Sequence, residues 1–215
     1  MIYVLITTSL IDKNFNNRKQ QYLLGISNTI MYFREVFKKN KIDYKFIIIE
    51  NNNKIDSFLN DFKQYSDIFY TNNNNLINNP NKGIKEIIDI HDCIKHYNIN
   101  DEDFIIKVTG RYILQENSEF IKIFNNYNEN IHCIVRYGSF FNKDDYNIND
   151  CVTGLIGLKC KYVKNIEIPD TLTCIEHKWA KTIKNEVPIL NIISLKKLGI
   201  YIIPEFGDNY HKYDI

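Results

Sequence analysis

Cysteine is scarce in this sequence and shows no arrangement that suggests a metal or redox site. The five cysteines are odd in number and scattered, with no CxxC pair and no cluster with histidine. This pattern argues against a disulfide framework and against a structural zinc site. It favours a reducing compartment, so we expect the protein to work in the cytoplasm.

Long apolar runs and several common catalytic motifs are also absent. No run approaches the roughly 20 apolar residues that cross a bilayer. The N-terminal MIYVLITTSLI lacks a basic segment, so we interpret it as a first strand and not as a signal peptide. Without GxxxxGK[ST] or GxSxG, a P-loop enzyme and a serine hydrolase are excluded. The net charge of +1 gives no electrostatic reason to expect nucleic acid as a partner.

Arginine is rare as well, whereas lysine, asparagine and isoleucine are frequent. The arginines lie only at positions 18, 34, 111 and 136. This bias suggests AT-rich coding DNA, and we attribute the asparagine runs at 51–53 and 72–75 to it and to loop composition. Each arginine is therefore more informative about function than an arginine in an average sequence.

Apolar patterning predicts an α/β fold in one domain. The 215 residues are 44% hydrophobic and 13% aromatic, which allows a sizeable core. Strand-like and helix-like runs alternate through the first half, which indicates a mostly parallel central sheet with helices on both faces. The expected strands are 3–7, 44–49, 68–70 and 104–108, and the expected helices are 18–39, 55–64 and one from Asn81 or Gly83, after a loop to Pro80.

The second half is less regular. After residue 115 we expect helices at 119–125 and 170–184, the latter capped by Asp170 or Thr171, and strands at 131–135, 152–158 and 200–203. A polar loop is expected at 140–150.

Ligands of open parallel sheets bind at the carboxyl ends of the strands. The residues at these strand ends are Thr7 and Thr8, Glu50 and Asn51, Thr71 and Asn72, and Thr109, Gly110 and Arg111. Lys107 lies inside an apolar strand, where an ammonium needs an anionic or hydrogen-bonding partner. Arg18 and Lys82, with Gly83 beside it, fall at helix starts near the same edge, where anions are favoured.

We therefore predict that Arg18, Lys82, Lys107 and Arg111 converge on a diphosphate. The alternative is that Arg18 and Lys82 are solvated loop charges. The acidic DED at 101–103 lies at the opposite end of its strand, so we do not interpret it as a metal-binding DxD motif.

Several segments resemble a known family. RKQQY (18–22), NKGIKE (81–86), IIKVTGRY (105–112), VTGLIGLK (152–159) and IEHKWAKTI (175–183) are similar to small glycosyltransferases of the GT-A type, from bacterial surface-polysaccharide clusters and large DNA viruses. The resemblance implies one GT-A-like domain. Residues 1–114 would bind a nucleotide-diphosphate sugar, most simply a UDP-sugar, and residues 115–215 a glycan or other hydroxyl acceptor. A viral protein would act in the host cytoplasm.

The resemblance also implies roles for single residues. Thr7, Thr8 and Arg18 would hold the nucleotide, and Lys82 would lie near base or phosphate. Thr109-Gly110-Arg111 occupies the place of the DxD motif that holds a divalent metal in many GT-A enzymes. Either Mn²⁺ or Mg²⁺ finds other ligands, such as Asp208 or His211, or cations stabilise the departing diphosphate directly. We expect the second.

Glycosyl transfer needs a base for the acceptor hydroxyl and positive charge for the leaving diphosphate. Arg111 and Lys107 are the candidate cations. Glu176 is the candidate base, although it could instead pair with Lys178 or the helix dipole, and Asp170 is the alternative base. On the acceptor side we expect the remaining candidates, Tyr112, Trp179, Thr153 and Gly154; core packing of the rings and a tight strand end at 153–154 are the alternatives.

Two other functions were weighed. A sugar-phosphate nucleotidyltransferase needs a glycine-rich loop after its first strand, but LITTSLIDKNFNNR contains no glycine. A catalytically inactive GT-A-fold protein that binds nucleotide or carbohydrate is the alternative from another class, and the missing DxD supports it.

Overall fold

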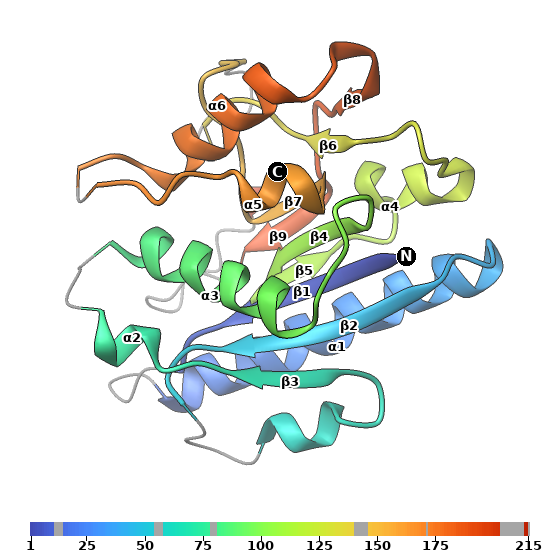
Figure 1. The fold of residues 1–215 in the computed structure, drawn as a ribbon. Helices are drawn as coiled ribbons and strands as arrows, with labels where there is room; N and C mark the ends of the chain where they lie inside the picture. Colours follow the sequence, from blue (N-terminus) through green and yellow to red (C-terminus); the bar gives the residue numbers. More distant parts are fainter. Residues whose placement is uncertain are drawn as a thin grey trace.

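A seven-stranded sheet runs through the centre of the computed structural model (Figure 1). The structure describes residues 1–10, 15–53, 58–77, 81–139, 146–170, 172–202 and 213–214. The order of the strands is β3-β2-β1-β4-β7-β6-β8. Their bounds are β1 Ile2–Thr8, β2 Tyr44–Glu50, β3 Asp67–Tyr70, β4 Phe104–Thr109, β6 Cys133–Val135, β7 Leu155–Lys159 and β8 Ile192–Ser194.

The first four strands of the sheet are parallel. β1 pairs with β2 and with β4, so that Thr7 lies beside both Ile49 and Thr109, and β2 pairs with β3. β7 is antiparallel to both β4 and β6, while β6 and β8 are parallel. The carboxyl ends of β1 to β4 and the start of β7 therefore meet at one edge. The expectation of a mostly parallel sheet is confirmed.

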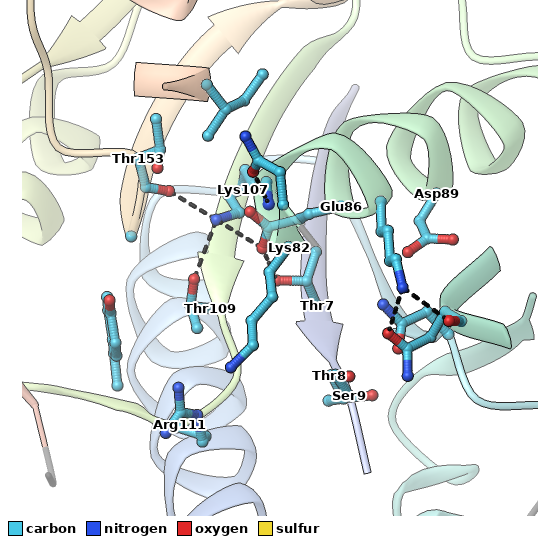
Figure 2. Close-up of a pocket in the computed structure, with 18 of the residues that line it drawn as sticks. Thr7, Thr8, Ser9, Lys82, Glu86, Asp89, Lys107, Thr109, Arg111 and Thr153 are labelled. Atoms are coloured by element: carbon cyan, nitrogen blue, oxygen red, sulfur yellow. Dashed lines mark hydrogen bonds and ion pairs between the residues drawn. The ribbon is translucent and has the colours of Figure 1, made fainter. Parts of the chain in front are cut away.

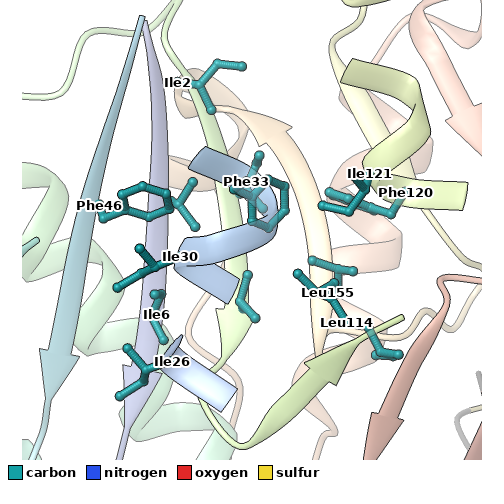
Figure 3. Close-up of a cluster of buried hydrophobic side chains, with 14 of the residues drawn as sticks. Ile2, Ile6, Ile26, Ile30, Phe33, Phe46, Leu114, Phe120, Ile121 and Leu155 are labelled. Carbon is teal, nitrogen blue, oxygen red and sulfur yellow. The ribbon is translucent and has the colours of Figure 1, made fainter. Parts of the chain in front are cut away.

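Helices cover both faces of the sheet, as predicted (Figure 1). Alternate residues of β1 face opposite ways, Val4 and Ile6 into one core and Leu5 into the other. The first core packs against α1 (Phe15–Lys39) and α4 (Glu119–Ile123), as Figure 3 shows. The 3₁₀ turns η2 (Phe58–Phe62) and η3 (Phe124–Asn126) also contribute to it. The second packs against α3 (Lys82–His96), α5 (Cys160–Lys164) and α6 (Ile175–Glu186). Among the described residues, no helix has the length and apolar character that a membrane crossing requires.

A small second sheet begins directly after β4. Its strands are β5 (Tyr112–Leu114), β9 (Ile200–Ile202) and β10 (Tyr213–Asp214), in the order β10-β9-β5. The turn at 110–111 is anchored by the Gly110 amide, which donates to the Thr7 carbonyl over 2.9 Å. A Cβ on Gly25 of α1 would overlap the Gly110 carbonyl oxygen and lie 2.9 Å from that of Tyr112. Helix α1 thus packs backbone to backbone against this turn.

Several predicted boundaries were wrong. Helix α6 begins at Ile175 after Cys174, because the Asp170 carboxylate instead closes a turn by accepting from the amides of Leu172 and Thr173, over 3.2 and 2.9 Å. The loop expected before Pro80 contains α2 (Asn73–Leu76). Strands β5 and β8, helix α5 and the turn η4 (Ile189–Asn191) were not predicted. Thr171 and 140–145 lie outside the described residues.

Candidate functional site

A cavity of about 470 Å³ lies at the edge where the parallel strands end (Figure 2). Its volume falls within the range of about 300–1,000 Å³ that small-molecule sites occupy. Residues from the ends of β1, β2 and β4, from the starts of α1, α3 and α6, and from the loop before β7 line it. Of the residues predicted from the sequence, it brings together Thr7, Thr8, Arg18, Asn51, Lys82, Gly83, Lys107, Thr109, Arg111, Tyr112, Thr153, Gly154 and Glu176.

Among the five cationic residues that line this cavity, Arg18, Lys82 and Arg111 come from different elements and influence one another's charge. Arg18 belongs to α1, Lys82 starts α3 and Arg111 follows β4. Burial lowers the pKa of Lys82, and the positive charges of Arg18 and Arg111 lower it further. Burial likewise lowers the pKa of Arg18, with a further contribution from Arg111. The three charges therefore repel one another across the cavity, and an anion placed between them would relieve this repulsion.

Lys107 has its partners within the protein. The side chain is only 2% exposed, and its ammonium forms an ion pair with Glu86 Oε1 at 2.8 Å. It also donates to Thr109 Oγ1 over 3.0 Å and to the Thr153 carbonyl over 2.8 Å (Figure 2). These contacts use all three N–H donors of an ammonium. A direct phosphate contact by Lys107 is therefore not supported: this lysine joins α3, β4 and the loop before β7.

Glu86 was missed by the sequence analysis, although it lies in the cavity wall. Its Oε1 accepts from Lys107 and also from Thr7 Oγ1, over 2.6 Å. Lys82, Glu86 and Asp89 recur at helical spacing, so one face of α3 turns its charged residues to the site. That periodicity indicates from the sequence that Glu86 shares a face of the helix with Lys82, but not that this face meets Lys107.

One asparagine from each run, Asn51 and Asn74, lines the cavity beside β2 and β3, so these positions have contacts that loop composition does not explain. Asn73 Nδ2 donates to Asp89 Oδ1 over 2.8 Å, and Thr71 donates to the same oxygen. Lys85 Nζ donates to the Asn74 carbonyl over 2.8 Å, and the backbone amide of Asn74 donates to the Asn51 carbonyl over 3.1 Å. Burial raises the pKa of Asp89 to about 6, against the effect of these hydrogen bonds.

Glu176 lies on the opposite wall, in the first turn of α6. Thr153 Oγ1 donates to its Oε1 over a long 3.5 Å. The alternative interpretation paired Glu176 with Lys178, but Lys178 forms an ion pair with Glu167 at 2.8 Å. The second-half wall thus presents a carboxylate and a hydroxyl together.

The ring of Tyr112 packs against Gly154, where a Cβ would overlap it. Burial raises the pKa of Tyr112 to about 12, so its hydroxyl is neutral at physiological pH. This packing supplies a structural reason for Gly154, whose carbonyl also accepts from the Thr109 amide over 2.9 Å. Trp179 is 2% exposed within the second core, so it does not stack on a sugar and that prediction was wrong.

Other predicted residues lie elsewhere. Gly110 is packed between β1 and α1 and does not line the cavity. At the far end of β4, Glu102 pairs with Lys159 and Lys161, each at 2.6 Å. Asp208 and His211 lie outside the described residues. Within the described part of the chain, no three His, Cys, Asp or Glu residues form a group that could hold a metal ion.

Comparison with known proteins identifies the fold. No model of a protein family matches the chain, and neither does any curated protein. S. aureus TarS 1–349 is similar in structure, with a TM-score of 0.55 and 12% identity, over 94% of this chain and 60% of that one. This likeness confirms a GT-A-like fold, and the chain spans about 60% of that structure.

Two further structures are more distantly similar. A glycosyltransferase involved in the glycosylation of the major capsid of PBCV-1 matches with a TM-score of 0.42 and 8% identity, over 87% of this chain and 68% of that one. HddC from Yersinia pseudotuberculosis matches with a TM-score of 0.45 and 14% identity, over 94% of both chains. At these scores neither carries weight for the function.

Proposed function

We propose that this chain is a glycosyltransferase that moves a sugar from a nucleoside-diphosphate sugar to a hydroxyl group of a glycan or another acceptor. The observation that carries the proposal is the cation cluster of Arg18, Lys82 and Arg111. It lies at the carboxyl edge of a parallel sheet, where open α/β folds bind their ligands. A diphosphate is the anion that suits three convergent cations, and a UDP-sugar is the first donor to test.

The donor half of the cavity would bind by charge and by polar groups. Guanidinium groups bind phosphate oxygens in pairs, so Arg18 and Arg111 would hold the diphosphate while Lys82 acts as a point charge. Thr7, Thr8 and Asn51 lie at the ends of β1 and β2 and line the cavity, so they would contact the nucleoside. As the glycosidic bond breaks, negative charge grows on the diphosphate, and fixed cations stabilise that charge most.

The acceptor half would supply the base. Glu176 faces the cavity beside Thr153, from a helix that belongs to the second half of the chain. A carboxylate within hydrogen-bond reach of an acceptor hydroxyl can remove its proton as the bond to the sugar forms. Proton removal by Glu176 and stabilisation of the leaving group by Arg111 would thus come from two different elements, α6 and the turn after β4.

A divalent metal is not needed for any step of this proposal. The described carboxylates of the cavity do not form a metal-binding group, and two of them, Glu86 and Asp89, already accept hydrogen bonds from the protein. Binding and transfer should therefore be measured both with and without Mn²⁺.

The test is calorimetric binding of UDP, UMP and uridine. UDP should bind most tightly, and Arg111→Ala should weaken UDP about 10- to 100-fold, as expected for losing a hydrogen bond between charged groups. Arg34→Ala is the matched control, because Arg34 lies over the ring of Tyr65, outside the cavity. UDP that binds no better than uridine, or equal effects of the two substitutions, would contradict the proposal.

Turnover separates an enzyme from an inactive binding protein. Wild type should release UDP slowly from UDP-sugars, and Glu176→Gln should lose transfer while keeping its affinity for UDP. Tight UDP binding without release from any donor, with or without acceptor and Mn²⁺, would instead support a nucleotide-binding protein of the same fold. The absence of a carboxylate pair at 109–111 is the observation that favours this second candidate.

A further inference from the structure

The cavity contains a negative group in addition to its cation cluster. Glu86 projects from α3 towards Lys107 and Thr7, as Figure 2 shows. Its side chain is 25% exposed, whereas that of Lys107 is 2% exposed. The pair therefore presents its carboxylate to the cavity and keeps its ammonium behind it.

The carboxylate of Glu86 is held through one oxygen. Lys107 at 2.8 Å and the Thr7 hydroxyl at 2.6 Å both contact Oε1. Among the described residues, Oε2 has no hydrogen bond or ion pair with another group. Because Lys107 is also fixed by Thr109 and Thr153, the carboxylate is held in place with Oε2 available to a ligand.

The position of Glu86 is between the two halves of the site. Lys107 binds the Thr153 carbonyl, and the Thr153 hydroxyl in turn donates to Glu176 over 3.5 Å. Glu86 is thus linked through two residues to the proposed base, while Lys82 lies one turn before it on α3. A group carried by a diphosphate between the cations and attacked from the side of Glu176 would therefore lie close to Glu86.

We propose that Glu86 determines donor specificity by accepting hydrogen bonds from hydroxyl groups of the transferred sugar. Glu86 would thereby disfavour donors whose sugar carries a carboxylate group. This inference rests on the function proposed above. An ionised carboxylate accepts short, strong hydrogen bonds from hydroxyl groups. A uronic acid would place a second carboxylate near Oε2, and Lys107 has no hydrogen-bond donor left for it because its three donors are in use.

The test compares UDP-glucose with UDP-glucuronic acid by calorimetry, or GDP-mannose with GDP-mannuronic acid if the protein binds guanosine nucleotides. Wild type should bind the neutral donor about tenfold more tightly or better, as like charges in a partly buried site require. Glu86→Gln keeps an acceptor for Lys107 and Thr7 but removes the charge, and should bring the ratio of the two affinities close to one.

Two further variants make the result interpretable. Glu86→Gln combined with Lys107→Met removes both charges and should show the same lost discrimination if the single variant fails to fold. Asp92→Asn makes the same change on an exposed residue of α3 outside the cavity, and should leave the ratio unchanged.

Each outcome decides the matter. Wild type that binds both donors equally, or a ratio that Glu86→Gln leaves unchanged, overturns the role of Glu86 while Arg111-dependent binding of UDP still stands. Wild type that binds no nucleotide overturns the proposed function and this inference together.

Discussion

Replacing Lys107 with methionine tests whether this lysine and Glu86 act as one unit. The substitution removes an ion pair of 2.8 Å and leaves the Thr153 carbonyl without its donor. An unsatisfied buried acceptor costs about 1–3 kcal/mol. Breaking a fully buried pair costs about 3–5 kcal/mol, but Glu86 is 25% exposed and can be hydrated. We therefore expect Lys107→Met to lower the free energy of unfolding by about 3 kcal/mol, a large share of the 5–15 kcal/mol of an average domain.

The companion substitution gives a sharper result. Glu86→Gln in wild type leaves an ammonium that is 2% exposed without a counter-ion, which should cost about 3 kcal/mol, at the lower end for a buried pair because the glutamine oxygen still accepts. In the Lys107→Met background that charge is gone, so the same substitution should cost almost nothing. Lys45→Met is the control: it removes an exposed pair with Asp67 and should cost less than about 1 kcal/mol.

Urea unfolding followed by tryptophan fluorescence measures all four variants. Trp179 is the only tryptophan and is 2% exposed, so its emission reports directly on loss of the second core. If Glu86→Gln costs the same in both backgrounds, to within about 0.5 kcal/mol, the two residues are independent and the reasoning is wrong.

Three further predictions concern single positions. Gly154→Ala should destabilise the protein by about 1–3 kcal/mol, because its methyl group overlaps the ring of Tyr112, and adding Tyr112→Leu should recover part of the loss in thermal unfolding. Burial raises the pKa of Asp89 from 3.8 to about 6, so stability falls as pH rises through this interval. Relative to wild type, the free energy of unfolding of Asp89→Asn should rise by about 2–3 kcal/mol between about pH 4 and pH 7. If urea titrations give a difference between the two proteins that does not change with pH, the prediction is refuted. Cys174 is the exposed cysteine and lies at the cavity, whereas the other four are buried, so a thiol reagent should label one site in the native protein and UDP should slow that labelling.

The position of the site at one edge of the sheet was predictable from the sequence, because the direction of the strands decides which residues lie at that edge. The apolar runs of β1 and β4 indicated buried parallel strands, and parallel strands end on the same side. Thr7 and Arg111 therefore had to lie near each other, although 104 positions separate them along the chain (111 minus 7). The same argument set the DED at 101–103 apart from the site.

The partner of the buried ammonium was not predictable in the same way. Lys107 was recognised as unusual, but Glu86 lies on a helix whose rotation about its axis depends on packing against the sheet. Gly110 shows a similar limit: the sequence indicated close approach, but not whether the approaching group was a ligand or the backbone of Gly25. Of the asparagines at 51–53 and 72–75, Asn51 was predicted from its place after β2, whereas Asn74 was missed because a compositional explanation was sufficient for it.

The contact between Gly25 and the turn after β4 bears on affinity as well as on packing. Arg18 lies in α1, the helix that also carries Gly25, and Arg111 lies in the turn that this glycine contacts. The anchor points of both guanidinium groups are therefore set by main-chain packing before any ligand arrives. Such preorganisation spares the entropy loss of gathering flexible side chains around a ligand. A residue without a side chain would thus help to decide how tightly the proposed diphosphate is bound.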